Sequence, residues 1–274
     1  MTKSLLALSL ILSSAAVSTS AMAAEHIAVS GSTSVTEVME VLGETYHKSH
    51  PDVFIDINGT GSTAGIKSSI EGVNDLGMAS RNLSAEEKKA GLVETEIARD
   101  GIAVVVNPKN PVNSLTKSQI EQLFKGDITQ WSQVGGNSDP VVVTTRENGS
   151  GTRGAFEELM ELTTKINGVK VSTISQRAQV ASGNGIEKTV VANNKDAIGF
   201  VSLGSIDNSL KAVEVDGHKA SVADVLNKTY PLSRPFLVLN QPGKLKPAAK
   251  EFLAWIMSPE GQKIIKDKGY IAMS

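Results

Sequence analysis

Short apolar runs alternate along the chain with stretches in which apolar residues recur every three or four positions. The short runs are rich in β-branched residues and predict strands at residues 27–30, 53–57, 102–106, 141–145, 198–201 and 236–239. The other spacing predicts helices at residues 35–47, 185–192, 247–257 and 259–266, with two more that start near residues 63 and 152. Alternating strands and helices favour an α/β protein with mostly parallel sheets.

Two further helix starts carry a reciprocal capping pattern. Ser84 is followed three residues later by Glu87, and Thr116 is followed by Gln119. In a capping box the hydroxyl and the longer side chain each accept a hydrogen bond from a backbone N–H group of the first turn. We therefore expect one helix to begin at each of these positions.

Three segments rich in glycine and hydroxyl residues each join a predicted strand to a predicted helix. They are residues 31–34 (GSTS), 59–65 (GTGSTAG) and 149–153 (GSGTR). A helix start leaves backbone N–H groups unpaired and carries partial positive charge, so it attracts anions. Ligands of α/β sheets bind at the carboxyl ends of strands, so the three segments together predict one oxyanion site. For each segment alone, the alternative is a simple helix cap or a polar loop.

Two segments that contain arginine strengthen this prediction. Arg146 precedes the third glycine segment and Arg153 ends it, and the rigid guanidinium group suits bidentate contact with an oxyanion. Ser80 and Arg81 end a short apolar run. By itself this second segment indicates a surface turn, and it gains weight only if it faces the other three.

Composition narrows the class of ligand. A formal net charge of −2 disfavours nucleic acid, and an aromatic content of 4% leaves few surfaces on which sugars or nucleobases could stack. The absence of cysteine excludes disulfides, thiolate metal ligands and cysteine nucleophiles. The glycine spacing of residues 59–65 matches neither nucleotide-binding fingerprint.

The sequence offers no evident catalytic or metal-binding constellation. The candidate serines lack a Gly-x-Ser-x-Gly elbow and a nearby histidine base. His47 and His50 have helical spacing, but no third metal ligand is evident. We therefore expect a protein that is not an enzyme and that needs no metal and no cofactor.

Residues 1–23 have the features of a secretory signal peptide. Lys3 supplies the positive start, residues 5–12 form a short apolar stretch, and Ala21, Met22 and Ala23 fit a small-residue cleavage site. We expect the mature chain to begin near Ala24 or Glu25, and to be soluble in the periplasm after the peptide is cleaved.

With these motifs in place, the chain resembles the periplasmic phosphate-binding proteins (PstS type) of bacterial ABC transporters. The resemblance covers nearly the whole mature chain. It rests on the three glycine segments, on residues 79–81 and 146–153, and on residues 124–131, 197–201 and 230–235.

This resemblance implies a class II periplasmic binding protein fold, with two lobes, a ligand cleft and two crossing strands. Residues 24–106 and 234–274 would form lobe 1, and residues 107–233 would form an inserted lobe 2. We expect a monomer that binds inorganic phosphate with high affinity and delivers it to the permease subunits of an ABC importer in the inner membrane, without a nucleic-acid partner. The phosphate-binding residues would be Thr33, Ser34, Ser62, Ser80, Arg81, Arg146, Ser150, Gly151 and Thr152.

One departure from the family pattern affects ligand selectivity. Well-known members carry an aspartate at the position of Ser80, where it accepts the phosphate proton. They carry a second aspartate at the position of Asn148, where it braces the arginine of the third segment. Our hypothesis is that Arg81 adds a second cation here, and that Glu147 or a backbone carbonyl accepts the proton. The alternatives are a binding protein for sulfate, molybdate or tungstate, a phosphoryl-transfer or hydrolytic enzyme, and a surface protein that reuses the fold.

Overall fold

The computed structural model describes residues 24–273, so the expected signal peptide at residues 1–23 lies outside the described residues. Within the described chain, ten strands form one sheet in the order β2-β1-β3-β13-β4-β10-β6-β9, with β11 and β14 also paired to β4. These strands are β1 (Glu25–Gly31), β2 (Val53–Gly59), β3 (Leu76–Ala79), β4 (Val93–Val106), β6 (Val142–Arg146), β9 (Gln179–Ala181), β10 (Ala197–Ser202), β11 (Lys211–Ala212), β13 (Ser233–Asn240) and β14 (Ile271–Ala272).

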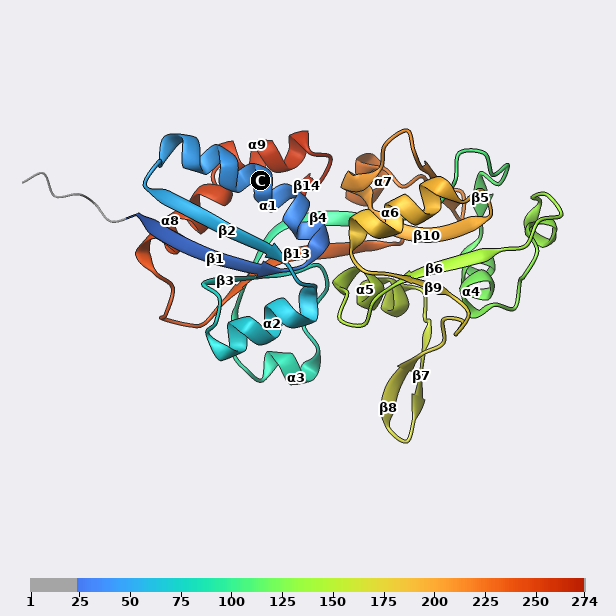
Figure 1. Ribbon diagram of the computed structural model, residues 1–274, viewed down its shortest axis with the longest axis horizontal. Coiled ribbons are helices and arrows are strands. Elements are labelled where there is room, and N and C mark those ends of the chain that lie inside the picture. The colour runs from blue at the N-terminus through green and yellow to red at the C-terminus, as the bar shows by residue number, and fades with distance from the viewer. Residues whose placement is uncertain (1–23, 274) are drawn as a thin grey trace, which may run out of the picture.

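Two small sheets lie apart from this one. The first pairs β5 (Ser114–Leu115) with β12 (Glu214–Val215), and the second pairs β7 (Thr163–Ile166) with β8 (Val169–Ser172). The β7–β8 pair is a hairpin that projects from the body of the molecule (Figure 1).

The predicted strands and helices are confirmed, with small shifts at their ends except at β4, which begins nine residues before the strand predicted at residues 102–106. The helices are α1 (Thr33–Ser49), α2 (Ser62–Glu71), α3 (Ala85–Lys88), α4 (Lys117–Lys125), α5 (Gly151–Leu159), α6 (Asn184–Asn193), α7 (Val222–Leu226), α8 (Pro247–Ile256) and α9 (Pro259–Asp267), with short 3₁₀ turns η1 (Trp131–Val134) and η2 (Leu203–Ser205). Both capping boxes form as expected, with Ser84 and Glu87 at α3 and Thr116 and Gln119 at α4.

The main sheet is mixed, and the expectation of mostly parallel pairing is wrong. Parallel pairs join β1 to β2 and β3, and β6 to β9 and β10. Strand β4 runs antiparallel to β10, β11, β13 and β14, and β13 runs antiparallel to β3. The cause is the return of the chain through β13 alongside β4, a long-range pairing that local periodicity does not report.

Strand β4 connects two separate hydrophobic cores. It pairs with β13 from Val93 to Gly101 and with β10 from Ile102 to Val106. The first core contains side chains of β1, α1, β3, β13, α8 and α9, and the second contains side chains of α4, α5, β10 and the later part of β4. In Figure 1 the elements of the first core lie on the left and those of the second on the right, with β4 and β13 passing between them.

The strand-to-helix junctions predicted from the sequence point toward the space between the two cores. Helix α1 follows β1, α2 follows β2, and α5 follows β6. At Gly31 the backbone φ is +143°, and a Cβ would overlap the carbonyl group of Met78, so this tight turn requires glycine. Among the described residues, no helix is long and apolar enough to cross a membrane.

Candidate functional site

Five hydroxyl side chains from separate parts of the chain meet where the two cores face each other. Ser32, Ser34, Ser62, Ser80 and Thr152 are all nearly inaccessible to solvent, and we call them the hydroxyl cluster. Oγ of Ser32 donates to Oγ of Ser80 at 2.8 Å, and Oγ of Ser34 lies 2.9 Å from Oγ1 of Thr152. Oγ of Ser62 accepts from the backbone N–H of Ser80 at 3.0 Å. The structure thus brings together the glycine segments predicted to converge.

A buried arginine that sequence reasoning did not assign to the site contacts this cluster. Arg234, at the start of β13, is 2% exposed, and its Nη1 donates to Oγ1 of Thr152 at 2.6 Å. Its Nη2 donates to Oγ of Ser34 at 3.2 Å. Its counter-ion is Asp100 of β4, whose Oδ2 accepts from Nη2 at 2.8 Å and from Nε at 3.1 Å. A positive charge therefore lies directly behind the hydroxyl groups.

The guanidinium of this ion pair keeps its charge despite burial, while burial raises the pKa of the Asp100 carboxyl against the opposing effect of Arg234. Burial lowers the pKa of the Arg234 guanidinium, while Asp100 opposes the shift. A guanidinium group begins with so high a pKa that it remains protonated in the pair at neutral pH. Because Arg234 donates to lone pairs of Ser34 and Thr152, those hydroxyl groups direct their own protons away from it. One of the two hydroxyl groups can donate its proton to the other, and the proton of the second hydroxyl is then free to form a hydrogen bond with a ligand.

Arg146 provides a second buried cation at the end of β6. It is 1% exposed, and its Nε and Nη2 each donate to the carboxylate of Glu147 at 2.9 Å. Nη2 also donates to Oγ1 of Thr33 at 3.1 Å. Its Nη1 is buried and has no hydrogen-bond partner within the described chain. An unpaired, buried N–H donor is costly, which makes Nη1 the strongest single indication of a ligand position.

Both carboxylate oxygens of Glu147 accept hydrogen bonds from Arg146. Burial acts to raise the pKa of Glu147, but the hydrogen bonds and charge of Arg146 outweigh it, and the pKa falls below its ordinary value. Oε2 also accepts from the backbone N–H of Gly183 at 3.1 Å. Glu147 is therefore a charged partner of the arginine, rather than a carboxyl group free to accept a ligand proton.

The start of α5 approaches the hydroxyl cluster through its backbone. Oγ of Ser150 caps the helix by accepting from the N–H of Arg153 at 3.2 Å. A Cβ at Gly151 would overlap Oγ of Ser62, so only glycine allows this approach. The carbonyl oxygen of Gly149 accepts from the N–H of Thr63 at 3.1 Å, which joins the third segment to the second.

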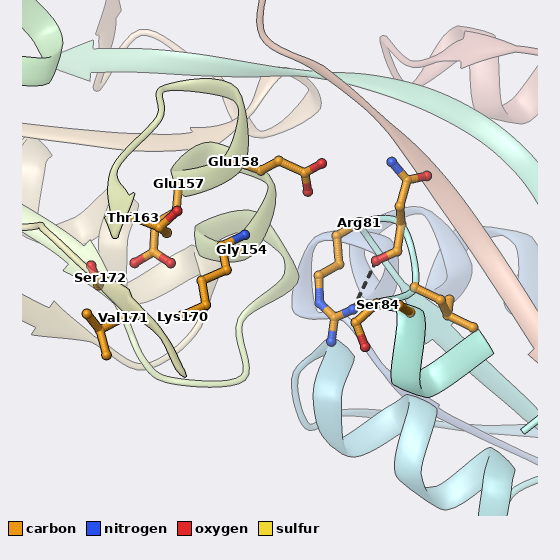
Figure 2. Close-up of a pocket in the computed structure, with 12 residues that line it drawn as sticks. Arg81, Ser84, Gly154, Glu157, Glu158, Thr163, Lys170, Val171 and Ser172 are labelled. Atoms are coloured by element: carbon orange, nitrogen blue, oxygen red, sulfur yellow. Dashed lines mark hydrogen bonds between the residues drawn. The ribbon is translucent and has the colours of Figure 1, made fainter. Parts of the chain in front are cut away.

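Arg81 lies beside the cluster rather than in it. Its guanidinium donates to the two carboxylate oxygens of Glu87 at 2.7 and 2.8 Å and to Oγ1 of Thr63 at 3.1 Å. These bonds lower the pKa of Glu87 to about 2. Figure 2 shows Arg81 on one wall of a groove of about 570 Å³, with Lys170 on the other. The structure places Arg234, not Arg81, behind the hydroxyl groups.

The two histidines considered as metal ligands have other contacts. Nδ1 of His47 lies 2.7 Å from the carbonyl oxygen of Val53, and the ring of His50 stacks on Tyr46 at 3.9 Å. Within residues 24–273, no group of three or more acidic, histidine or cysteine side chains is arranged to hold a metal ion.

Comparison with known proteins identifies the class to which this fold and site belong. The sequence profile of the PBP superfamily domain matches residues 16–260. A phosphate ABC transporter substrate-binding protein from Clostridium perfringens, solved with bound phosphate, superposes with a TM-score of 0.86 and is 45% identical over 91% of this chain and 100% of that one. The chain therefore belongs to the PBP superfamily and has the α/β periplasmic binding protein fold, class II.

Sequence relatives place it more narrowly. The phosphate-binding protein PstS of Staphylococcus epidermidis is 31% identical over 88% of this chain and 77% of its own length. PstS 2 of Streptococcus agalactiae is 40% identical, but over only 48% of this chain and 45% of the relative, so this alignment spans less than half of either protein. The chain is a member of the PstS family.

Proposed function

We propose that this protein binds inorganic phosphate at the hydroxyl cluster and delivers it from the periplasm to an ABC-type importer. The observation that carries the proposal is the unpaired, buried Nη1 of Arg146 beside a cluster of hydroxyl donors backed by Arg234. The phosphate bound by the Clostridium perfringens relative supports it, since that protein is 45% identical.

The donors suit a fully enclosed oxyanion. Hydroxyl groups would come from Thr33, Ser34, Ser62, Ser80, Ser150 and Thr152, and a backbone N–H from Gly151. Arg146 would contact the anion, and Arg234 would add positive charge from behind. Burying an anion without partners is prohibitive, but each charge-assisted hydrogen bond contributes about 1.5–3 kcal/mol. Several such bonds can offset desolvation and still leave the roughly 8 kcal/mol that a micromolar Kd requires.

We further propose that the site lies between two lobes, residues 24–106 with 234–274 and residues 107–233. The separate hydrophobic cores support this division, although the change of strand partner at Gly101 falls a few residues before the proposed boundary. Contacts between the two parts surround the site, among them the 2.9 Å contact of Ser34 with Thr152. Binding one anion to donors of both parts would favour a closed arrangement.

Sulfate is the second candidate ligand, and a specific feature of the site favours it. Phosphate at neutral pH carries a proton that a carboxylate could accept, whereas sulfate needs only donors. The carboxylates nearest the cluster, Asp100 and Glu147, are each held by an arginine and by a backbone N–H. A hydroxyl or carbonyl oxygen would then accept the proton of phosphate. Ser80 would therefore distinguish phosphate from sulfate less well than an aspartate at the same position.

Titration calorimetry of the leaderless protein with phosphate, arsenate, sulfate and molybdate tests the proposal. We expect phosphate and arsenate to bind with a Kd of micromolar or below, and sulfate to bind more than about tenfold more weakly. Tighter binding of sulfate than of phosphate would select the second candidate, and no binding of any of the four would overturn the proposed site. We propose that the protein acts as a monomer and is not an enzyme, so a chromogenic phosphate ester should remain unhydrolysed.

A further inference from the structure

A fully buried carboxyl group lies below the anion site and takes no part in the contacts described so far. Glu187 of α6 has 0% of its surface exposed. Its Oε1 accepts from Oγ1 of Thr144 at 2.7 Å and from the backbone N–H of Phe200 at 3.3 Å. Its Oε2 is buried and has no partner within the described residues. A Cβ at Gly199 would overlap Oε1, so the carboxyl group is packed directly against the sheet.

The geometry of β6 links this carboxyl group to Arg146. Alternate residues of a strand point to the same face, so Thr144 and Arg146 share one side of β6. Glu187 is bonded to Thr144, and the charge of Arg146 acts on it from the same side. Both groups also have an unpaired atom, Oε2 of Glu187 and Nη1 of Arg146.

Few other charges face Glu187. On the strands and turn packed against α6, β6 contributes Arg146, which is followed by Glu147, while β9, β10 and η2 contain no titratable side chain. β4 packs its apolar residues Ala103 and Val105 against α6. Three more charged groups lie farther along α6 or at its start. Glu37 of α1 accepts from the side chain of Asn184 at the start of α6, and Lys188 of α6 pairs with Asp207 at the surface. Of these charged groups, Arg146 acts to lower the pKa of Glu187 and Glu147 acts to raise it.

The environment makes the protonation of Glu187 sensitive to small changes of charge. Burial raises the pKa of Glu187 to about 7, against the opposing effects of the hydrogen bonds from Thr144 and Phe200 and the charge of Arg146. A carboxyl group with this pKa is partly protonated at neutral pH, where an exposed glutamate is fully ionised.

We propose that Glu187 is the proton-binding group of the anion site, and that it takes up a proton from solvent when an oxyanion binds Arg146. The inference rests on the function proposed above. An anion on Nη1 and an ionised Glu187 compete for the same cation, and a carboxylate buried beside a new negative charge is disfavoured. By linkage, protonation of Glu187 strengthens anion binding, and anion binding raises the proton affinity of Glu187 to the same extent.

A consequence is that the proton offsets part of the negative charge that the ligand brings into the buried site. The carboxyl group gains one proton, and no bond other than its O–H forms or breaks. Oε2, which has no partner, is the oxygen available to receive the proton. The affinity for phosphate should therefore fall above neutral pH more steeply than the titration of phosphate itself requires.

Calorimetry in two buffers with different enthalpies of ionisation measures the proton uptake directly. With phosphate as the probe at pH 7 and pH 8, the titration of phosphate contributes equally to the wild-type protein and to Glu187→Gln, and cancels in their difference. We expect the wild type to take up about half a proton more per phosphate at pH 7, and more than that at pH 8. Glu158→Gln, which alters an exposed glutamate of α5, is the matched control and should behave as the wild type.

The outcomes separate this inference from the proposed function. Equal proton uptake by the wild type and by Glu187→Gln would overturn the role of Glu187 and leave phosphate binding intact. Absence of phosphate binding by the wild type would overturn both. If Glu187→Gln does not fold, carbon-13 NMR of the glutamate carboxyl groups in the wild type replaces it. There we expect one carboxyl pKa near 7 that rises on adding phosphate, and an unchanged pKa would refute the proposal.

Discussion

Gly151 is required at the start of α5 because the side chain of Ser62 lies directly against it. A Cβ there would overlap Oγ of Ser62, at the place where the start of α5 meets the hydroxyl cluster. Overpacking of a close contact typically costs 1–3 kcal/mol, and here the cost would fall on the contact between the two parts that form the site.

We predict that Gly151→Ala weakens phosphate binding by about tenfold or more, as measured by calorimetry. Gly185→Ala is the matched control, because a Cβ at that helical position would meet no atom within 4 Å. Equal affinities for the two variants would show that close approach of the α5 backbone is not required.

Arg234 should determine affinity through its two hydroxyl contacts. Lysine keeps the positive charge but cannot reach Asp100, Ser34 and Thr152 in the same plane. Because each charge-assisted bond contributes about 1.5–3 kcal/mol, Arg234→Lys should weaken phosphate binding by about 10- to 100-fold. Arg177→Lys changes an exposed arginine and serves as the control. An affinity of the Arg234 variant within twofold of wild type would remove Arg234 from the site.

The composition of the site was only partly readable from the sequence. Thr33, Ser34, Ser62 and Thr152 stood in glycine-rich junctions, whose chemistry is local, and Ser80 stood at the end of a short apolar run. Asp100 and Arg234 stood inside or beside apolar strand runs, and each needs the other to be tolerated when buried. The available signal was a charged residue at one end of two predicted strands, but their pairing depends on the long-range register of β4 with β13.

At the scale of elements, helix starts were the most predictable feature. A capping box involves residues only three positions apart, so Thr116 and Gln119 predict the start of α4 independently of the rest of the fold. The first part of β4 was missed because Glu94 and Glu96 interrupt its apolar pattern. The β7–β8 hairpin was missed too, although its turn residues Asn167 and Gly168 both adopt positive φ.

The capping box of α4 offers a test that should leave the site unaffected. Oγ1 of Thr116 accepts from the N–H of Gln119 at 3.1 Å. We predict that Thr116→Ala lowers the free energy of unfolding by about 1 kcal/mol in denaturant titrations, with unchanged phosphate affinity. Ser118→Ala, in the first turn of the same helix, should cost less. An equal loss in both variants would argue against a specific capping contribution.

For the whole molecule, the arrangement of strands predicts how the protein responds to its ligand. Within residues 24–273, β4 and the segment entering β13 connect the two cores within the sheet, so relative motion of the cores can be accommodated there. Small-angle scattering should show a smaller radius of gyration when phosphate is added to the wild type. Gly151→Ala at the same phosphate concentration should show less compaction. An unchanged radius in the wild type would contradict closure.

The hydrogen bond from the N–H of Ile102 to the carbonyl oxygen of Leu232, at 2.7 Å, has a further consequence for this fold. It means that residues 102–232 leave and rejoin the remaining chain at a single point. A different domain whose two ends lie equally close together could therefore replace residues 102–232, by evolution or by design, and leave the course of the remaining chain unchanged.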